Sequence, residues 1–138
     1  MSADTFPGVV EIKAFVPAKD FALSIAFYQD LGFTLASNED GIAYFFCGES
    51  SFLLQDFYVQ THAENFMMHL LVDDALAWWD RVQAQRLTER YAVQATPPAE
   101  RPWGMVDFTL TDPSGVLWRI AHNIPPARLT RVFPFRCP

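Results

Sequence analysis

The chain is most readily understood from the segment Arg101-Pro-Trp-Gly-Met-Val-Asp-Phe-Thr-Leu-Thr-Asp-Pro-Ser-Gly-Val-Leu-Trp-Arg-Ile-Ala-His122, which has the pattern of a β-hairpin. Apolar Phe108 and Leu110 alternate with threonines, as expected for a strand with one buried face. The sequence Asp112-Pro-Ser-Gly115 is typical of a tight turn. We therefore expect a second strand over Val116–Ile120 that runs back beside the first.

The first half of the chain has the order of one strand, one helix and three strands. An alternating pattern predicts the first strand at Val9–Phe15. Lys19-Asp20 is a good helix start and Gly32 a good helix stop, so a helix is predicted between them. Turn signals then separate three predicted strands at Phe33–Ser37, Ile42–Cys47 and Ser51–Phe57. This half therefore has the order βαβββ.

The same order repeats after a polar linker at residues 59–65. The predicted elements are a strand at Phe66–Val72, a helix from Asp73-Asp74 through Gln85, a strand around Arg90–Gln94, a Pro-rich loop at Thr96–Pro102 and the closing hairpin. We expect a single domain over residues 1–138. It would comprise one module at about 8–58, the linker, a second module at about 66–123 and a tail at 124–138.

Composition narrows the class of protein. The 138 residues are 51% hydrophobic and 19% charged, which is typical of a folded domain rather than a disordered chain. The net charge of −6 argues against a nucleic-acid partner. No apolar run reaches the roughly 18 residues that a membrane-spanning helix needs, and the first residues lack the layout of a signal peptide. We therefore expect a cytoplasmic protein without a membrane partner.

Two motifs resemble those of one superfamily. The hairpin segment contains Pro102-Trp-Gly104, then Phe108, then Asp112-Pro-Ser-Gly115. The first predicted helix contains Ser24-Ile-Ala-Phe-Tyr, which is followed by Leu-Gly-Phe33. Together they resemble the vicinal oxygen chelate superfamily, which includes glyoxalases, bleomycin-resistance proteins and extradiol dioxygenases. The resemblance covers about residues 8 to 123. It implies an α+β fold in which two βαβββ modules form a curved mixed-sheet cup.

The resemblance also implies where a metal ion would bind. Metal-dependent members place one ligand on each of four strands, and the matching positions here are Lys13, Gln55, Met67 and Arg119. An ammonium and a guanidinium group would repel a divalent ion. We therefore expect neither a metal nor another cofactor, and a closer similarity to the metal-independent bleomycin-resistance branch. The alternative is an irregular metal site made by Glu11, His69 and His122.

The predicted cup has an apolar wall with a few polar groups, which suits a flat organic ligand. The candidate ligand-binding residues are Lys13, Phe15, Gln55, Phe57, Met67, His69, Trp103 and Arg119. Arg119 and Lys13 could bind a ligand carboxylate or phosphate, or Arg119 could pair with an internal acid such as Glu11. Trp103 is a candidate lid over the cup or, equally, a plug on the sheet edge.

Three functions remain open from the sequence. The leading hypothesis is a homodimeric binding protein that sequesters a small organic ligand, for example a cationic antibiotic, and carries out no catalysis. The positive charge of Lys13 and Arg119 leaves an anionic or neutral ligand open as well. The second hypothesis is a metal-dependent lyase, isomerase or dioxygenase with a displaced site. The third is an accessory domain that binds a protein partner through the tail segment 128–136.

Overall fold

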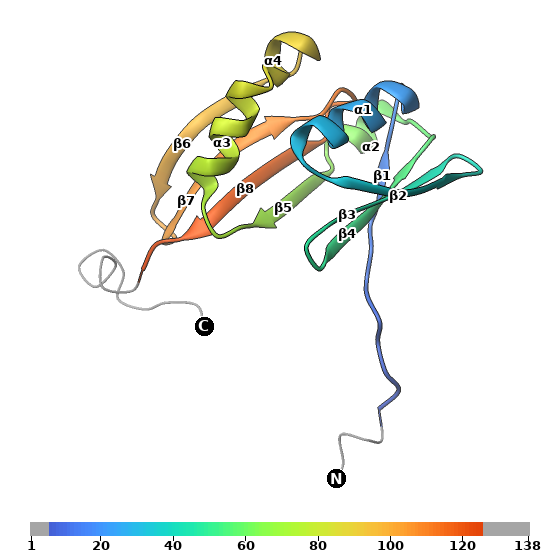
Figure 1. Ribbon diagram of the computed structural model, residues 1–138, viewed down its shortest axis with the longest axis horizontal. Helices are drawn as coiled ribbons and strands as arrows, with labels where there is room; N and C mark the ends of the chain where they lie inside the picture. The colour runs from blue at the N-terminus through green and yellow to red at the C-terminus, as the bar shows by residue number, and fades with distance from the viewer. Residues whose placement is uncertain (1–5, 126–138) are drawn as a thin grey trace.

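The computed structural model describes residues 6–125, which form two four-stranded sheets with helices packed against them (Figure 1). The first module contains β1 (Phe15–Pro17), α1 (Phe21–Leu31), β2 (Thr34–Glu39), β3 (Ile42–Cys47) and β4 (Ser50–Gln55). The short helix α2 (Gln60–Ala63) follows it. The second module contains β5 (Met67–Leu71), α3 (Ala75–Ala84), α4 (Leu87–Arg90), β6 (Ala95–Arg101), β7 (Met105–Thr111) and β8 (Leu117–Asn123).

Both sheets have the same topology. The strand order is β1-β4-β3-β2 in the first and β5-β8-β7-β6 in the second. In each sheet the first strand in the chain pairs in parallel with the last, and the other neighbours are antiparallel. The expected α+β fold of two βαβββ modules is therefore confirmed, with α2 and α4 as additions.

The two long helices begin where the sequence predicted. The Asp20 carboxylate accepts a hydrogen bond of 3.1 Å from the backbone N–H of Leu23 at the start of α1. The Asp74 carboxylate caps α3 in the same way. Helix α1 ends at Gly32, whose φ of 133° is a conformation that residues with a side chain rarely adopt.

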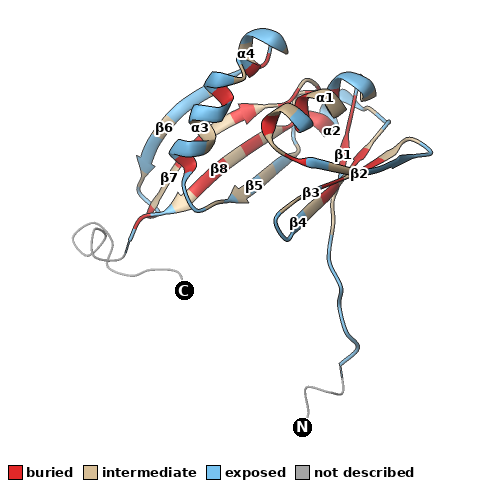
Figure 2. Cartoon of the chain, in the orientation of Figure 1, coloured by how far each residue is buried: buried red, intermediate tan, exposed pale blue. Residues whose placement is uncertain are grey.

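The hydrophobic core is shared by the two modules. Along β8, buried positions alternate with less buried ones, and Trp118 and Ile120 lie on the buried side (Figure 2). The Trp118 ring lies 5.6 Å from the Tyr28 ring of α1 and 5.4 Å from the Phe52 ring of β4, measured between centroids. Such aromatic pairs add to the free energy gained by burial. The two modules therefore pack as one unit.

Three local expectations were wrong. The Pro-rich segment forms strand β6 instead of a loop, because its prolines lie on a sheet edge at a point where the pairing register shifts. Residues 90–94, expected as a strand, lie at the end of α4 and in the turn after it. The segment expected as a linker contains the short helix α2, which does not bear on its role as a linker. The first strand extends only over Phe15–Pro17, because these are the only residues of the segment in ladder register with β4. Ala14 still accepts a backbone hydrogen bond from Leu53, and the residues before it contact the sheet only through side chains such as Glu11.

Two further observations bear on the expected partners. Within residues 6–125, no helix is long and apolar enough to cross a membrane. The segment 128–136, which carries the hypothesis of a protein partner, lies outside the described residues.

Candidate functional site

The first sheet has one face away from the helices that carries aromatic and polar side chains. Its residues alternate with the buried Ala43, Phe45 and Phe52. Phe46 and Phe15 are exposed on this face, although both are large and apolar. We call it the first face, and define it by Phe15, Ile42, Tyr44, Phe46, Ser51, Leu53 and Gln55.

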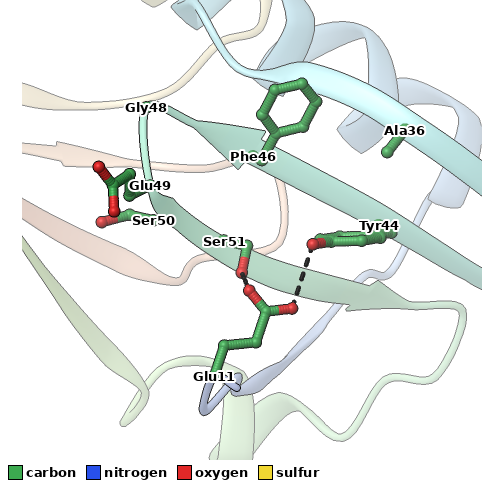
Figure 3. A pocket seen from close by; sticks show the side chains of 8 residues that line it. All are labelled: Glu11, Ala36, Tyr44, Phe46, Gly48, Glu49, Ser50 and Ser51. Atoms are coloured by element: carbon green, nitrogen blue, oxygen red, sulfur yellow. Dashed lines mark hydrogen bonds between the residues drawn. The ribbon is translucent and has the colours of Figure 1, made fainter.

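The N-terminal segment places a carboxylate on the first face. Glu11 accepts hydrogen bonds from the Tyr44 hydroxyl (3.1 Å) and the Ser51 hydroxyl (2.9 Å), as Figure 3 shows. The Lys13 ammonium donates a further hydrogen bond to Glu11 and lies 5.2 Å from the centroid of the Tyr44 ring. The hydrogen bond from Lys13, followed by the one from Ser51, lowers the pKa of the Glu11 carboxyl. Glu11 is therefore held as an anion.

Two shallow hollows adjoin these residues. The first is about 310 Å³ in volume and is lined by Glu11, Ala36, Tyr44, Phe46 and residues 48–51 (Figure 3). The second, of about 320 Å³, lies between the modules and is lined by Phe33, Trp118 and residues 50–52 and 68–71. Each has the volume that a small organic molecule occupies.

The second sheet also has one face away from its long helix. We call it the second face, and define it by Met67, His69, Leu71, Asp107, Thr109, Leu117 and Arg119. Met67 is 59% exposed and Leu71 is 54% exposed, which is high for apolar side chains on a strand. In the strand register, Arg119 lies directly between His69 and Thr109.

A buried carboxylate organises the arginines of the second face. Asp107 is fully buried and accepts a hydrogen bond of 2.7 Å from Nε of Arg101. Nη1 of Arg119 lies 3.1 Å from Oδ1 and 3.0 Å from Oδ2 of the same carboxylate. The guanidinium carbon of Arg119 lies 6.0 Å from the ring centroid of Trp103. Asp107 therefore fixes two guanidinium groups beside an exposed indole ring.

The candidate residues from the sequence, except Phe57, fall into two groups. One group lies on or beside the first face and comprises Lys13, Phe15 and Gln55, and the other lies on or beside the second and comprises Met67, His69, Trp103 and Arg119. Phe57 lies beyond the end of β4, where its backbone bonds to Gln55 and Ala18, and its side chain is exposed. The internal acid that pairs with Arg119 is Asp107 and not Glu11.

Sequence reasoning missed Asp107 and Arg101 as members of the site. The signal for Asp107 was present, because it alternates with Phe108 and so shares a face with Thr109. The signal for Arg101 was hidden, since its segment was expected to be a loop. Tyr44 and Ser51 were missed because nothing in their local sequence predicts that Glu11 lies against them.

The four positions that the superfamily uses for a metal ion do not fit one here. Lys13 and Arg119 are cations engaged with Glu11 and Asp107, and a divalent ion beside them would be repelled. Nor do the residues of the irregular alternative form a cluster. In residues 6–125, no three His, Cys, Asp or Glu side chains lie close enough together to hold a metal ion. Nδ1 of His122 accepts a hydrogen bond from the backbone N–H of Ala75.

The fold is similar to that of solved proteins with different activities. One is a bleomycin-binding protein in complex with bleomycin, with 22% sequence identity, a TM-score of 0.68, and coverage of 82% of this chain and 98% of that one. The antibiotic-binding protein TnmS3 from Streptomyces sp. CB03234 has 23% identity and a TM-score of 0.67, over 86% and 99% of the chains. Lactoylglutathione lyase from Agrobacterium tumefaciens has 18% identity and a TM-score of 0.62, over 83% and 95%. At these identities the similarity establishes the fold.

Sequence comparison assigns the family. The sequence comparison with curated proteins gives no match. The family model described as Glyoxalase/Bleomycin resistance protein/Dioxygenase superfamily matches residues 10–120, which is most of the chain and includes both modules. The chain therefore belongs to the glyoxalase/bleomycin resistance protein/dioxygenase superfamily.

Proposed function

We propose that the chain is a metal-independent binding protein that holds a flat organic ligand, such as an antibiotic, against its open sheet faces and leaves it chemically unchanged. The proposal rests on the residues that occupy the four positions at which metal-dependent members of the superfamily carry their ligands. Two of the four are cations already paired with acids, which are Lys13 with Glu11 and Arg119 with Asp107. This arrangement disfavours a divalent ion and leaves polar groups suited to an organic molecule.

The side chains of the two faces support a planar ligand. Phe15, Phe46 and Tyr44 offer aromatic surface on the first face, and Met67 and Leu71 offer adaptable apolar surface on the second. Aromatic rings stack favourably on such side chains, and polar groups at the edge then fix the orientation. The bleomycin-binding protein and TnmS3, which share the fold, bind antibiotics according to their descriptions.

The open faces also support a homodimer. The apolar side chains of Met67 and Leu71 are more than half exposed, and Val10 in the N-terminal segment is 99% exposed. Large exposed apolar patches commonly mark interfaces. In this proposal a second copy of the chain covers part of each face, and the ligand lies at the interface.

Metal analysis combined with a ligand screen tests the proposed function. The purified chain would be incubated with zinc, nickel, manganese or iron(II), desalted and analysed for bound metal. Calorimetry against a panel of cationic, neutral and anionic aromatic compounds would follow. The proposal expects negligible metal and saturable binding of at least one compound, which is recovered unchanged. About one metal ion per chain, lost on His69→Ala substitution, would instead support a metal-dependent enzyme.

Sedimentation velocity tests the dimer separately. Leu71→Glu places a charge on the second face and is expected to shift the dimer towards the monomer. Leu76→Glu is the matched control, because Leu76 is 50% exposed but lies on α3, away from that face. A wild-type chain that remains monomeric at high concentration would contradict the dimer.

A further inference from the structure

We infer that the second face recognises an anionic group, either a carboxylate or a phosphate, on a planar aromatic ligand. Arg119 and Arg101 would bind the anion, and Trp103 would stack on the ring. The inference rests on the proposed function, since it names the class of ligand that the binding protein holds. Three features of the second face carry it, which are its charge, its unused hydrogen-bond donors and its aromatic neighbour.

The charges of the cluster do not cancel. Arg101 and Arg119 share a single carboxylate, that of Asp107, so the three side chains together keep one positive charge. Each arginine side chain is 27% exposed, whereas Asp107 is fully buried. The positive groups therefore reach solvent and the negative group does not. This arrangement attracts anions locally, although the whole chain carries a net charge of −6.

The guanidinium groups keep donors for a ligand. A guanidinium group has five N–H donors in a fixed planar arrangement. Arg101 uses Nε to bind Asp107, and Arg119 uses Nη1. Among the described residues, the remaining nitrogens of both groups make no other hydrogen bond. Each group therefore keeps a pair of donors that matches the two oxygens of a carboxylate or phosphate. The pair is Nε and Nη2 in Arg119, and the two terminal nitrogens in Arg101.

The neighbours of Arg119 suit the rest of such a ligand. Trp103 is 57% exposed and lies against the Arg119 guanidinium, so its ring offers a stacking surface beside the anion site. His69 and Thr109, which flank Arg119 in the strand register, are further polar groups in the same row. Asp107 holds the two guanidinium groups in place before any ligand arrives, which lowers the entropic cost of binding.

A purely structural role is the alternative for this cluster. Asp107 is on β7, Arg101 on β6 and Arg119 on β8, so the ion pairs could serve only to hold three strands together. That role predicts that changing Arg119 alters stability but does not alter the preference for charged ligands. Ligand preference therefore separates the two roles, whereas stability does not.

The test uses calorimetry on the full chain with three compounds of similar shape and different charge. They are 2-naphthoate, 2-naphthamide and 2-naphthylmethylamine, which are anionic, neutral and cationic at neutral pH. We expect 2-naphthoate to bind about tenfold more tightly than 2-naphthamide, which corresponds to about 1.4 kcal/mol. 2-Naphthyl phosphate, measured in parallel, distinguishes a carboxylate from a phosphate as the preferred anion.

Variants of the arginines complete the test. Arg119→Met is expected to remove the preference for 2-naphthoate over 2-naphthamide. Arg119→Lys keeps the charge but loses the fork of donors, so it should keep part of the preference. Arg86→Met is the matched control, because Arg86 pairs with Glu89 at an exposed site on α4, and it should behave as wild type. Thermal unfolding of each variant checks that it is folded.

The outcomes separate the inference from the proposed function. Equal affinity for 2-naphthoate and 2-naphthamide, or a preference that survives Arg119→Met, would overturn the inference and leave a binding protein. Tighter binding of 2-naphthylmethylamine would also overturn it, and would point to Glu11 as the polar contact. No binding of any of the four compounds would overturn the inference. If the wider panel also failed to bind, the proposed function would fail with it.

Discussion

The Tyr28 hydroxyl donates a hydrogen bond of 2.5 Å to the Asp112 carboxylate, and this contact joins the helix of the first module to the hairpin turn of the second. The same hydroxyl accepts a hydrogen bond of 2.8 Å from Nε1 of Trp118. Asp112 also accepts hydrogen bonds from the backbone N–H groups of Ser114 and Val116. The two sequence motifs that indicated the superfamily therefore meet in one buried network.

Removal of the Tyr28 hydroxyl is expected to destabilise the chain. In Tyr28→Phe, Trp118 loses its acceptor and Asp112 loses one donor, and neither can turn to water because both are buried. The expected loss in the free energy of unfolding is about 1–3 kcal/mol, measured by urea denaturation. Tyr44→Phe is the control, because the Tyr44 hydroxyl contacts the solvent-accessible Glu11, and should cost less than about 0.5 kcal/mol. Equal losses would contradict the role of the buried network.

The buried network also predicts a dependence of stability on pH. Burial raises the pKa of the Asp112 carboxyl above its ordinary value of 3.8, although its hydrogen bonds from Tyr28 and the backbone act in the opposite direction. The folded chain then holds this proton more tightly than the unfolded chain. The contribution of Asp112 to stability is therefore largest below pH 3.8 and falls as pH rises through the raised pKa.

A comparison of wild type with Asp112→Asn isolates that contribution. The free energy of unfolding of both would be measured by urea denaturation from about pH 3 to pH 7. The difference, wild type minus variant, should decrease as pH rises and level off above the raised pKa. A difference that increases with pH would mean that the hydrogen bonds outweigh burial and that the folded-state pKa is lowered.

Sequence patterns predicted the strand and helix order well because each module repeats strong local signals. Asp20 and Asp74 supply their carboxylates to the first turns of α1 and α3, and a cap of this kind is decided by a few neighbouring residues. The turn at Asp112 is equally local, since its carboxylate binds backbone groups two and four residues ahead. Features fixed by such short-range contacts are the ones that could be read from the chain alone.

Tertiary context decided the elements that sequence reasoning missed. Pro97 and Pro98 suggested a loop, but they lie on β6, which is an edge strand. The register with β7 shifts at these two residues, so the sheet does not require the N–H groups that prolines lack. The alternating pattern at residues 9–15 suggested a long strand. Only its end pairs with β4 as a strand, whereas Glu11 and Lys13 contact the sheet through their side chains. Edge position and chain direction are not encoded in local patterns.

The candidate site could be predicted only in part for the same reason. Period-two alternation correctly placed Met67, His69 and Arg119 in positions that share one face. It could not identify the acid that pairs with Arg119, because Asp107 lies on the neighbouring strand β7, two residues from Thr109, and the pairing register of two strands is not read from the sequence of either one. Similarly, local patterns did not show that Lys13 pairs with Glu11, and its contact with a ligand stays a prediction.

The pairing of Lys13 with Glu11 makes a prediction that nuclear magnetic resonance can check. The hydrogen bond from Lys13 is the largest cause of the lowered pKa of Glu11, so Lys13→Met should raise that pKa towards its ordinary value of 4.5. Ser51→Ala removes the next largest cause and should raise it less. Titration of the Glu11 carboxyl carbon measures both. An unchanged pKa in Lys13→Met would show that the two side chains do not pair in solution.

The last prediction concerns the stability of the arginine cluster. Asp107→Asn leaves the two arginines without a carboxylate, although both can still reach water at their exposed edges. The expected loss in the free energy of unfolding is about 1.5–3 kcal/mol, which is the usual value for hydrogen bonds to a charged group. Asp80→Asn is the control, since Asp80 is exposed on α3 and should change stability by less than about 0.5 kcal/mol. If the two variants cost the same, Asp107 would not hold the guanidinium groups in place, and Arg101 and Arg119 would have to be positioned by a ligand when it binds.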